Sequence, residues 1–350
     1  MPQLERLLAV LKDPEIIEFI INDDGSVYVE RGSTVLDKLD FHASPEDISA
    51  LLCVLGGPGL NIGPARPYAE LSAPDGSRVH VLAFPIVRGS FAVTIRKRPS
   101  HRPSIKELAL GATLTPACAA FLDCAVQQHK NILIVGGASS GKTTLLNGLC
   151  GLIGETNRIL VIEDIPELSL PQPHVVYIKT RMRDPDGLVD VSLRDLVRNT
   201  LRMRPDRIVV GEVAGPEALD MLQAMNLGQE GVMATLHANS CREALQRLET
   251  LVLMAGLDMP LRAVRGNVAL AVDLIVFLAR LSDGTRRVAQ VAEVTGLEIE
   301  NILMIDLFKM ESRKSSGGQT FALRPTGTVP RFYDQMREQG FEPPLEFFRA

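Results

Sequence analysis

Two kinds of hydrophobic pattern divide the chain near residue 100. Up to about residue 98, apolar and polar positions alternate in short stretches such as IIEFIIND, SVYVER and FAVTIRKR. The tripeptides Asp23-Asp24-Gly25 and Pro74-Asp75-Gly76 are typical hairpin turns, and SPEDISALLCVLGG between them has a helical pattern. Residues 1–98 are therefore predicted to form a small N-terminal α+β domain.

Continuous apolar stretches replace this alternation after Thr115. NILIVGG, RILVIED and RIVVGE are strands of the fully buried kind, and segments with helical periodicity separate them. Apolar strands that alternate with helices indicate a doubly wound α/β domain. Beyond Arg280 the pattern becomes hairpin-like, and PRFYDQMREQG is a last helix. We assign residues 115–350 to this domain and residues 99–114, with two prolines and one short helix, to a linker.

Composition and charge exclude several classes of protein. The 350 residues carry a formal net charge of -5, and no stretch combines aromatic with basic residues, so we expect no nucleic-acid partner. Five cysteines form no CxxC pair, which favours a reducing compartment. The N-terminus lacks a signal-peptide pattern, and no window reaches the roughly 18 to 20 apolar residues of a membrane span. We expect a cytoplasmic protein whose membrane contacts pass through partners.

A phosphate-binding loop follows the first buried strand, because residues 136–143 fit the pattern G-x-x-x-x-G-K-[ST]. Glycines let backbone N–H groups surround a phosphate, and the helix that begins at Lys142 directs its positive end toward the same anion. Lys142 supplies a charge for the β- and γ-phosphates, and the hydroxyl of Thr143 can bind Mg²⁺. We predict an ATP site formed by Gly136, Gly137, Ala138, Ser139, Ser140, Gly141, Lys142, Thr143 and Thr144.

Acidic residues end two later strands of the same domain. Glu212 ends IVVGE, and Glu163 ends LVIE, with Glu167 shortly after it. Metal-assisted phosphoryl transfer needs carboxylates at the carboxyl ends of strands beside the P-loop strand. We predict that Glu212 binds Mg²⁺ or orients water and that Glu163 is a second catalytic acid. The alternative is that either acid is an ordinary solvent-facing residue at the end of a strand, without a catalytic role.

One histidine and several arginines are further candidates. His237 follows an apolar stretch in ATLHAN, where it is either a packed core residue or a sensor of the γ-phosphate. Arg96 stands at the edge of the first domain, and Arg202 lies in a basic stretch before the RIVVGE strand. Such arginines form a solvated basic face or contact phosphate within the subunit or from a neighbour. We name Arg96 and Arg202 as candidate nucleotide ligands.

Taken in order, the motifs resemble those of the secretion ATPase superfamily, which drives type II and type IV secretion and type IV pili. The resemblance covers nearly the whole chain and rests on GGASSGKTT, RILVIEDIPEL, LRMRPDRIVVGEVAGPEALD and GQEGVMATLHANS. The C-terminal RPTGTVPRFYDQMREQGF and the N-terminal IIEFIINDDGSVYVERG are most similar to the CpaF-like ATPases of tight-adherence (Tad/Flp) pilus assembly.

This resemblance implies a RecA-like motor that works as a homohexameric ring on pilus platform proteins at the cytoplasmic side of the inner membrane. ATP-driven movement would extrude or retract pilin subunits. By matching position, it implies these roles: Lys142 and Thr143 as the P-loop lysine and Mg²⁺-binding hydroxyl, Glu212 as the Walker B glutamate, Glu163 in water activation, His237 as the histidine of the TxHAN segment, and Arg96 as an arginine that reaches nucleotide.

Four positions depart from the family pattern. Ala138 and Ser139 replace the Thr and Gly of GGTGSGKTT, but Gly141 and Lys142 remain, so we expect nucleotide binding to survive. Ala214 stands where the family has the arginine of GEVRG, and Gln229 replaces the first histidine of its GHxG element. Both changes bear on sensing between subunits and on the rate of turnover.

Three other functions compete with a pilus motor. A conjugative type IV secretion ATPase shares nearly all the motifs. A nucleotide-gated scaffold that barely hydrolyses ATP is favoured by Ala214 and Gln229. A nucleic-acid translocating motor is opposed by the acidic balance of the chain.

Overall fold

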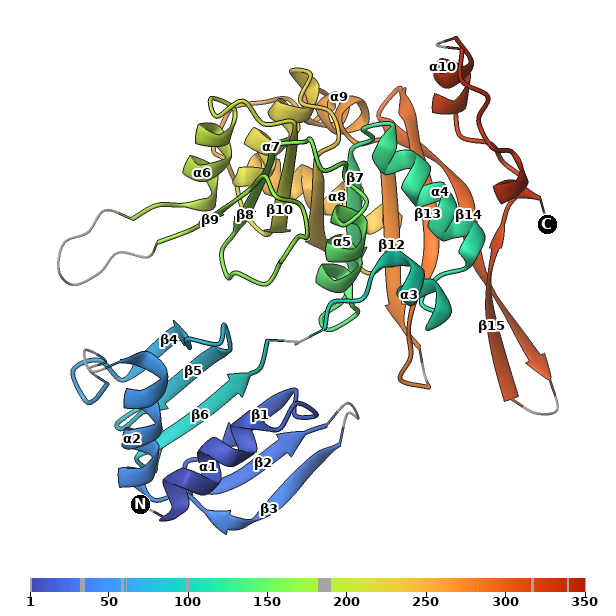
Figure 1. The fold of residues 1–350 in the computed structure, drawn as a ribbon. Helices are drawn as coiled ribbons and strands as arrows, with labels where there is room; N and C mark the ends of the chain where they lie inside the picture. The colour runs from blue at the N-terminus through green and yellow to red at the C-terminus, as the bar shows by residue number, and fades with distance from the viewer. Residues whose placement is uncertain are drawn as a thin grey trace. The chain divides into compact units, whose positions relative to one another are not determined.

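The computed structural model describes residues 2–31, 35–57, 60, 62–98, 101–181, 190–281, 283–315, 318–338 and 340–349. Contacts within the chain divide it into two compact units, Met1–His101 (unit 1) and Arg102–Ala350 (unit 2). Each unit has a sheet of its own and is described by itself (Figure 1).

Unit 1 is an antiparallel sheet of six strands in the order β3-β2-β1-β6-β5-β4, with two helices. Its elements are α1 (Pro2–Lys12), β1 (Glu18–Ile21), β2 (Ser26–Glu30), β3 (Leu36–His42), α2 (Pro45–Gly56), β4 (Tyr68–Ser72), β5 (Arg78–Ala83) and β6 (Phe91–Arg96). The alternating apolar residues of the strands share one core cluster with Leu7 of α1 and Leu51 of α2. Alternation therefore predicts both the strands and the buried face of this sheet.

The two predicted hairpin turns of unit 1 are confirmed. Gly25 lies between β1 and β2 with φ 81°, and Gly76 lies between β4 and β5 with φ 82°. Residues other than glycine rarely adopt such angles, so each glycine closes its turn without strain.

Unit 2 is a nine-stranded mixed sheet in the order β15-β14-β13-β12-β7-β11-β10-β8-β9. The six strands β12, β7, β11, β10, β8 and β9 pair in parallel. Strands β13, β14 and β15 extend the sheet beyond β12 as an antiparallel meander. The strands are β7 (Ile132–Gly136), β8 (Ile159–Glu163), β9 (Val175–Lys179), β10 (Arg207–Val213), β11 (Met233–His237), β12 (Leu274–Arg280), β13 (Arg286–Glu298), β14 (Asn301–Ser315) and β15 (Gly318–Pro325).

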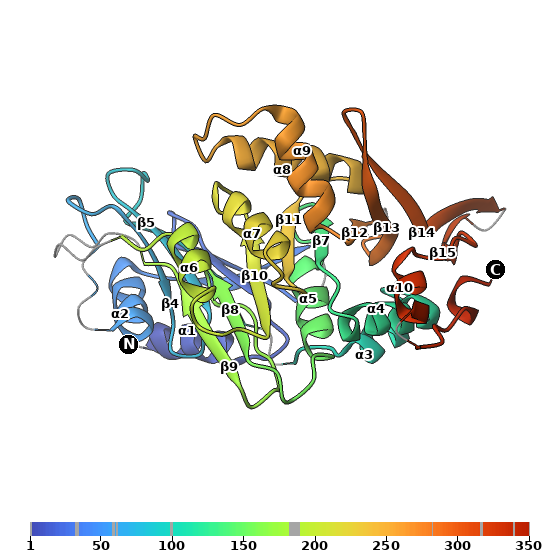
Figure 2. The same ribbon diagram turned by 90° about the horizontal axis from the view of Figure 1, so that it is seen from above.

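Helices cover both faces of this sheet (Figure 2). They are α3 (Ile105–Leu110), α4 (Pro116–Gln127), α5 (Lys142–Cys150), α6 (Leu193–Thr200), α7 (Glu217–Asn226), α8 (Cys241–Leu253), α9 (Leu261–Ala271), α10 (Phe332–Glu338) and the 3₁₀ turn η1 (Glu346–Phe348). Ile134 of β7 points into a core with α3, α4, α5 and α10, whereas the next residue, Val135, points into a second core with α6 to α9. This two-sided burial confirms the predicted α/β class, because it requires continuously apolar strands.

The short helix that we expected within residues 99–114 is α3, and it belongs to unit 2. Ser104 caps α3, and its hydroxyl and Glu107 form a reciprocal capping box. Ile105 and Leu108 are buried in the core beside α4 and α5. Among the described residues, no helix has the length and apolar character needed to cross a membrane.

Candidate active site

The loop between β7 and α5 has the backbone geometry of a phosphate cradle. A Cβ on Gly136 would overlap Ser140 Oγ and lie 2.6 Å from Leu278 O, so only glycine fits there. Gly141, which precedes α5, is left-handed with φ 97°. Ser139 also adopts a positive φ of 55°, a conformation that glycine would adopt at lower cost. The replacement of the family's glycine by Ser139 is therefore accommodated with local backbone strain.

Two polar groups of this loop are placed for an anion. Lys142 is buried, and its Nζ donates to Gly137 O at 2.9 Å. The Ser140 hydroxyl is buried and has no hydrogen-bond partner among the described residues. A buried hydroxyl without a partner is costly. Together with the N-terminus of α5, these groups fit a phosphate.

The strand order corrects one prediction from sequence. We expected the strands that end in acids to lie beside the P-loop strand, but β7 pairs with β11 and β12. β10, which carries Glu212, lies beyond β11, and β8, which ends in Glu163, lies beyond β10. Order along the chain does not fix order in a parallel sheet, because each crossover can return to any position.

Glu212 and His237 form a pair at the carboxyl ends of neighbouring strands. His237 Nε2 lies 3.0 Å from Glu212 Oε1, and both side chains are about half exposed (47% and 48%). His237 is therefore no packed core residue. Its strand is joined to β10 by a further bond, in which Thr235 Oγ1 donates to Gly211 O at 2.5 Å. His237 also pairs in register with Gly136, the first residue of the P-loop.

Glu163 holds a loop rather than facing solvent. It is only 4% exposed, and its Oε1 accepts the backbone N–H groups of Glu167 at 2.8 Å and Leu168 at 2.9 Å. Burial raises the pKa of this carboxyl, and the two hydrogen bonds oppose the rise. A Cβ on Gly211 would lie 2.9 Å from Glu163 Cγ, so the glycine of IVVGE makes room for the acid.

The charges that act on Lys142 come from two other acids. Burial lowers the pKa of the Lys142 amine, and the negative charges of Glu212 and Glu167 oppose this shift. Glu167, to which we gave no role from sequence, is thus the acid of the RILVIEDIPEL segment whose charge raises the pKa of Lys142. The short spacing between Glu163 and Glu167 was a weak sequence signal for this role. The carboxylate of Glu163 accepts the backbone N–H of Glu167 and so keeps the two acids close together.

Arg286 is a second residue that the sequence did not single out. It begins β13, and its Cδ would lie 3.7 Å from a Cβ on Gly141. An arginine side chain therefore runs along the P-loop. Its neighbour Arg287 donates from Nη1 to Phe321 O in β15 at 3.4 Å. No motif marks Arg286, because its hairpin is far from the P-loop in sequence.

The arginines of the basic stretch before β10 lie away from the P-loop within unit 2, whereas Arg96 belongs to unit 1, which is described by itself. Arg96 ends β6 in unit 1. Arg202 is exposed in the turn before β10, which is the amino end of that strand, whereas the P-loop lies at the carboxyl ends. Arg198 binds Asp220 on α7 at 2.6 Å. Arg207 is 2% exposed, and its Nη2 donates to Val126 O at 2.6 Å.

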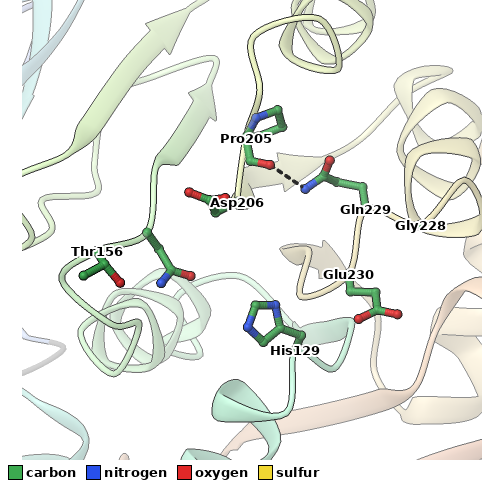
Figure 3. Close-up of a pocket in the computed structure, with 8 residues that line it drawn as sticks. His129, Thr156, Pro205, Asp206, Gly228, Gln229 and Glu230 are labelled. Atoms are coloured by element: carbon green, nitrogen blue, oxygen red, sulfur yellow. Dashed lines mark hydrogen bonds between the residues drawn. The ribbon is translucent and has the colours of Figure 1, made fainter.

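The two departures Ala214 and Gln229 lie at opposite edges of the sheet. Ala214 follows β10 at the P-loop edge, and its N–H donates to Glu217 Oε1 at 2.7 Å. Gln229 lies at the amino edge, where its Nε2 donates to Pro205 O at 3.1 Å (Figure 3). There it lines a cavity of about 440 Å³ together with His129, Thr156, Asn157, Pro205, Asp206, Gly228 and Glu230. Gln229 therefore connects the loop before β11 to the loop before β10, at the sheet edge opposite the P-loop.

Within the described part of the chain, no group of three or more His, Cys, Asp or Glu side chains could hold a metal ion. A magnesium ion bound to nucleotide needs fewer protein ligands, because phosphate oxygens and water complete its shell. The hydroxyl of Thr143 at the start of α5 and the carboxylate of Glu212 are of the right chemistry for such an ion.

Comparison with known proteins identifies the family. The type II/IV secretion system protein family matches residues 66–314. A Mycobacterium tuberculosis (strain H37Rv) protein described as a putative conjugal transfer protein is 38% identical over 215 residues, which are 61% of this chain and 60% of that protein. The probable conjugal transfer protein TrbB of Sinorhizobium fredii is 32% identical over 296 residues, 83% of this chain and 86% of its own length.

A solved structure of the pilus retraction motor PilT with bound ADP has the same fold. Its TM-score is 0.59 at 20% identity, and the match covers 96% of this chain and 86% of that chain. The RecA-like architecture expected for unit 2 is therefore confirmed. Because the family model matches most of this chain, the chain belongs to the type II/IV secretion system protein family.

Proposed function

We propose that this protein is a motor that binds ATP at residues 136–144 and hydrolyses it to do mechanical work in a secretion or pilus machine. The observation that carries the proposal is the P-loop itself. Buried Lys142 and the Ser140 hydroxyl, which has no partner among the described residues, are placed to bind an anion there, and the Glu212–His237 pair lies at the carboxyl ends of β10 and β11. Membership of the secretion family supports the mechanical role.

The residues divide the work of phosphoryl transfer. Lys142 Nζ exchanges Gly137 O for oxygens of the β- and γ-phosphates, while the N–H groups at the start of α5 hold the same phosphates. Glu212 is half exposed and can reach a water molecule, as a general base must. His237 reports the state of the γ-phosphate to β11 through its contact with Glu212.

Mg²⁺ is the proposed cofactor, with Thr143 and Glu212 as the residues that would hold it or its water shell. A magnesium ion bound to ATP neutralises charge that develops on the phosphates. Glu163 stays in the proposal as a residue that positions the segment carrying Glu167, since its own carboxyl is covered.

The machine that the motor serves is the finer question. We infer Tad-type pilus assembly or retraction from the C-terminal RPTGTVPRFYDQMREQGF and the N-terminal strands. Conjugative type IV secretion is the second candidate, because the relatives compared above are described as conjugal transfer proteins. Deletion of the gene distinguishes the two: loss of surface pili supports the first, and loss of plasmid transfer with pili intact supports the second.

The proposed assembly is a homohexamer in the cytoplasm that docks on inner-membrane platform proteins. In such a ring, Arg96 of unit 1 and Arg202, which precedes β10 at the sheet edge opposite the P-loop, would contact nucleotide bound by a neighbouring subunit. An arginine supplied from a neighbour can raise the rate by about 10³ to 10⁵, so activity would depend on assembly.

The test measures phosphate release and oligomeric mass on the same sample. With Mg²⁺ and ATP, the wild-type protein should release phosphate as a hexamer, and Lys142→Ala and Glu212→Gln should each lower the rate by at least about 10²-fold. Arg349→Ala, at the exposed C-terminal end, is the control.

Two results would change the proposal. If the wild-type hexamer binds ATP but shows no turnover, the protein is a nucleotide-gated scaffold, and Ala214 is the first position to restore to arginine. If the protein stays monomeric at every concentration with nucleotide present, the ring motor is wrong.

A further inference from the structure

The helix that follows the P-loop packs near its C-terminal end against the first residues of unit 2. A Cβ on Gly148 of α5 would lie 3.2 Å from Leu108 Cδ1 and 3.3 Å from Pro103 O. Glycine inside a helix costs about 1 kcal/mol relative to alanine, so its presence in α5 needs a reason. The close approach of the chain at residues 103–108 supplies that reason.

Asn147, the preceding residue of α5, links three segments through one oxygen. It is 8% exposed. Its Oδ1 accepts the backbone N–H of Ser169 at 2.9 Å and Nη1 of Arg102 at 3.5 Å. A side-chain carbonyl oxygen has two lone pairs, and both lone pairs of Asn147 Oδ1 accept a donor. This oxygen therefore connects α5 with the segment after Glu167 and with the first residue of unit 2.

The segment after Glu163 depends on this contact for its position. Glu163 holds the N–H groups of Glu167 and Leu168, and Asn147 takes the next N–H, that of Ser169. Further along, Gln172 Nε2 donates to Cys150 O at the end of α5. The segment that carries Glu167 is therefore attached along α5, from Asn147 to Cys150.

Arg102 connects this arrangement to the point where the chain enters unit 2. Its Nη1–Oδ1 distance of 3.5 Å is long for a hydrogen bond, so this contact is weaker than that of Ser169. The charge of Arg102 also lowers the pKa of Glu163, although burial raises it more. Arg102 thus interacts with Asn147 of α5 and, through its charge, with Glu163 at the end of β8.

We propose that Asn147 is a positioning residue that couples occupation of the P-loop to the segment 102–110, by which the chain enters the motor unit. The inference rests on the proposed function, because it needs a nucleotide on the loop. Nucleotide orders the N-terminal end of α5 and the Glu167 segment, and Asn147 passes that order to Arg102 and α3. Ordering of one segment lowers the cost of ordering those attached to it.

Hydrogen–deuterium exchange on the full chain tests the coupling. With saturating AMP-PNP and Mg²⁺, exchange at residues 104–110 should slow by about fivefold or more, along with exchange at the P-loop. Asn147→Ala should keep the affinity for the analogue within about threefold but lose the slowing at 104–110. Asn147→Asp, which keeps oxygen acceptors in place, should retain it.

A matched control comes from Asn226 at the end of α7, whose Nδ2 donates to Asn267 O at 3.1 Å. Asn226→Ala should leave both the binding and the protection as in wild type. Gly148→Ala gives a second route, since its Cβ presses residues 103–108 away from α5 while Asn147 remains. This variant should also lose the slowing at 104–110.

The outcomes separate this inference from the proposed function. If AMP-PNP fails to bind, the proposed function is wrong and the inference falls with it. If AMP-PNP binds and protects the P-loop but not residues 104–110 of the wild-type chain, only the coupling is wrong. The coupling through Asn147 is also wrong if nucleotide protects residues 104–110 of Asn147→Ala as strongly as those of wild type.

Discussion

Three carboxylates stand at the P-loop end of unit 2 in different surroundings. Glu212 is half exposed and paired with His237, whereas Glu163 is buried under two backbone N–H groups. Glu167 acts on Lys142 by its charge. A base that activates water must reach that water, so the exposure of Glu212 supports the proposal that it is the base, and the burial of Glu163 supports a positioning role for that acid.

The raised pKa of Glu163 predicts how stability depends on pH. The folded protein holds the proton more tightly than the unfolded chain, whose carboxyl titrates near 4.5. Protons are therefore released on unfolding, and the free energy of unfolding falls as pH rises above that value. Glu163→Gln removes this dependence but keeps an oxygen acceptor.

Urea unfolding at pH 4, 6 and 8 measures the effect. The variant should gain stability relative to wild type as pH rises, and the difference should level off above the folded pKa. A difference that is constant across pH, or one that shrinks as pH rises, would contradict the prediction.

Arg286 predicts a change in nucleotide affinity. Its side chain lies along Gly141, and a hydrogen bond to a charged group contributes about 1.5 to 3 kcal/mol. Arg286→Ala should raise KM for ATP by about tenfold or more and change kcat less, because the contact exists before and during the reaction. Arg287→Ala, whose side chain reaches Phe321 O instead, is the matched control. Equal KM values in both variants would show that Arg286 does not touch ATP.

At the residue scale, the sequence predicts those site residues that are adjacent to one another along the chain. The P-loop could be found because its glycines, lysine and threonine follow one another between a strand and a helix. Arg286 and Glu167 could not be assigned, because their roles depend on packing between distant segments. The strain at Ser139 is likewise visible only as a backbone angle.

At the element scale, burial decides which strands the sequence reveals. β7, β8 and β10 are buried on both faces and stand out as apolar runs. β9 and β3 are edge strands with exposed positions, and their pattern is correspondingly weak. Strand order in the sheet could not be derived at all, since β11 enters between β7 and β10 after both in the chain.

The C-terminal elements predict a large effect from one core residue. Phe121 of α4 packs against Phe308, Phe332 and Phe348 with ring centroids 5.4 to 6.1 Å apart. It is fully buried, and truncating such a ring costs about 3 to 5 kcal/mol. Phe121→Ala should lower the free energy of unfolding by that amount in a urea titration. Phe341→Ala, at an exposed phenylalanine, should change it by less than about 0.5 kcal/mol.

At the scale of the whole molecule, each unit has its own sheet and core. The change from alternating to continuous apolar strands predicts this difference, since one sheet is covered on one face and the other on both. Separate cores allow separate unfolding transitions. Nucleotide should therefore act first on unit 2, which holds the P-loop.

Calorimetry with and without AMP-PNP and Mg²⁺ measures the unfolding transition of each unit and so tests the role of Arg96. Ligand at 100 times Kd stabilises the unit that binds it by about 2.7 kcal/mol, which is about 5 to 10 °C for a unit of this size. If Arg96 contacts nucleotide, as we propose, the transition of unit 1 must rise as well, because its unfolding would break that contact. Arg96→Ala should then abolish the shift of unit 1 and leave most of that of unit 2, whereas Lys142→Ala should abolish both. A wild-type unit 1 that is indifferent to AMP-PNP would remove Arg96 from the nucleotide site and leave the P-loop assignment standing.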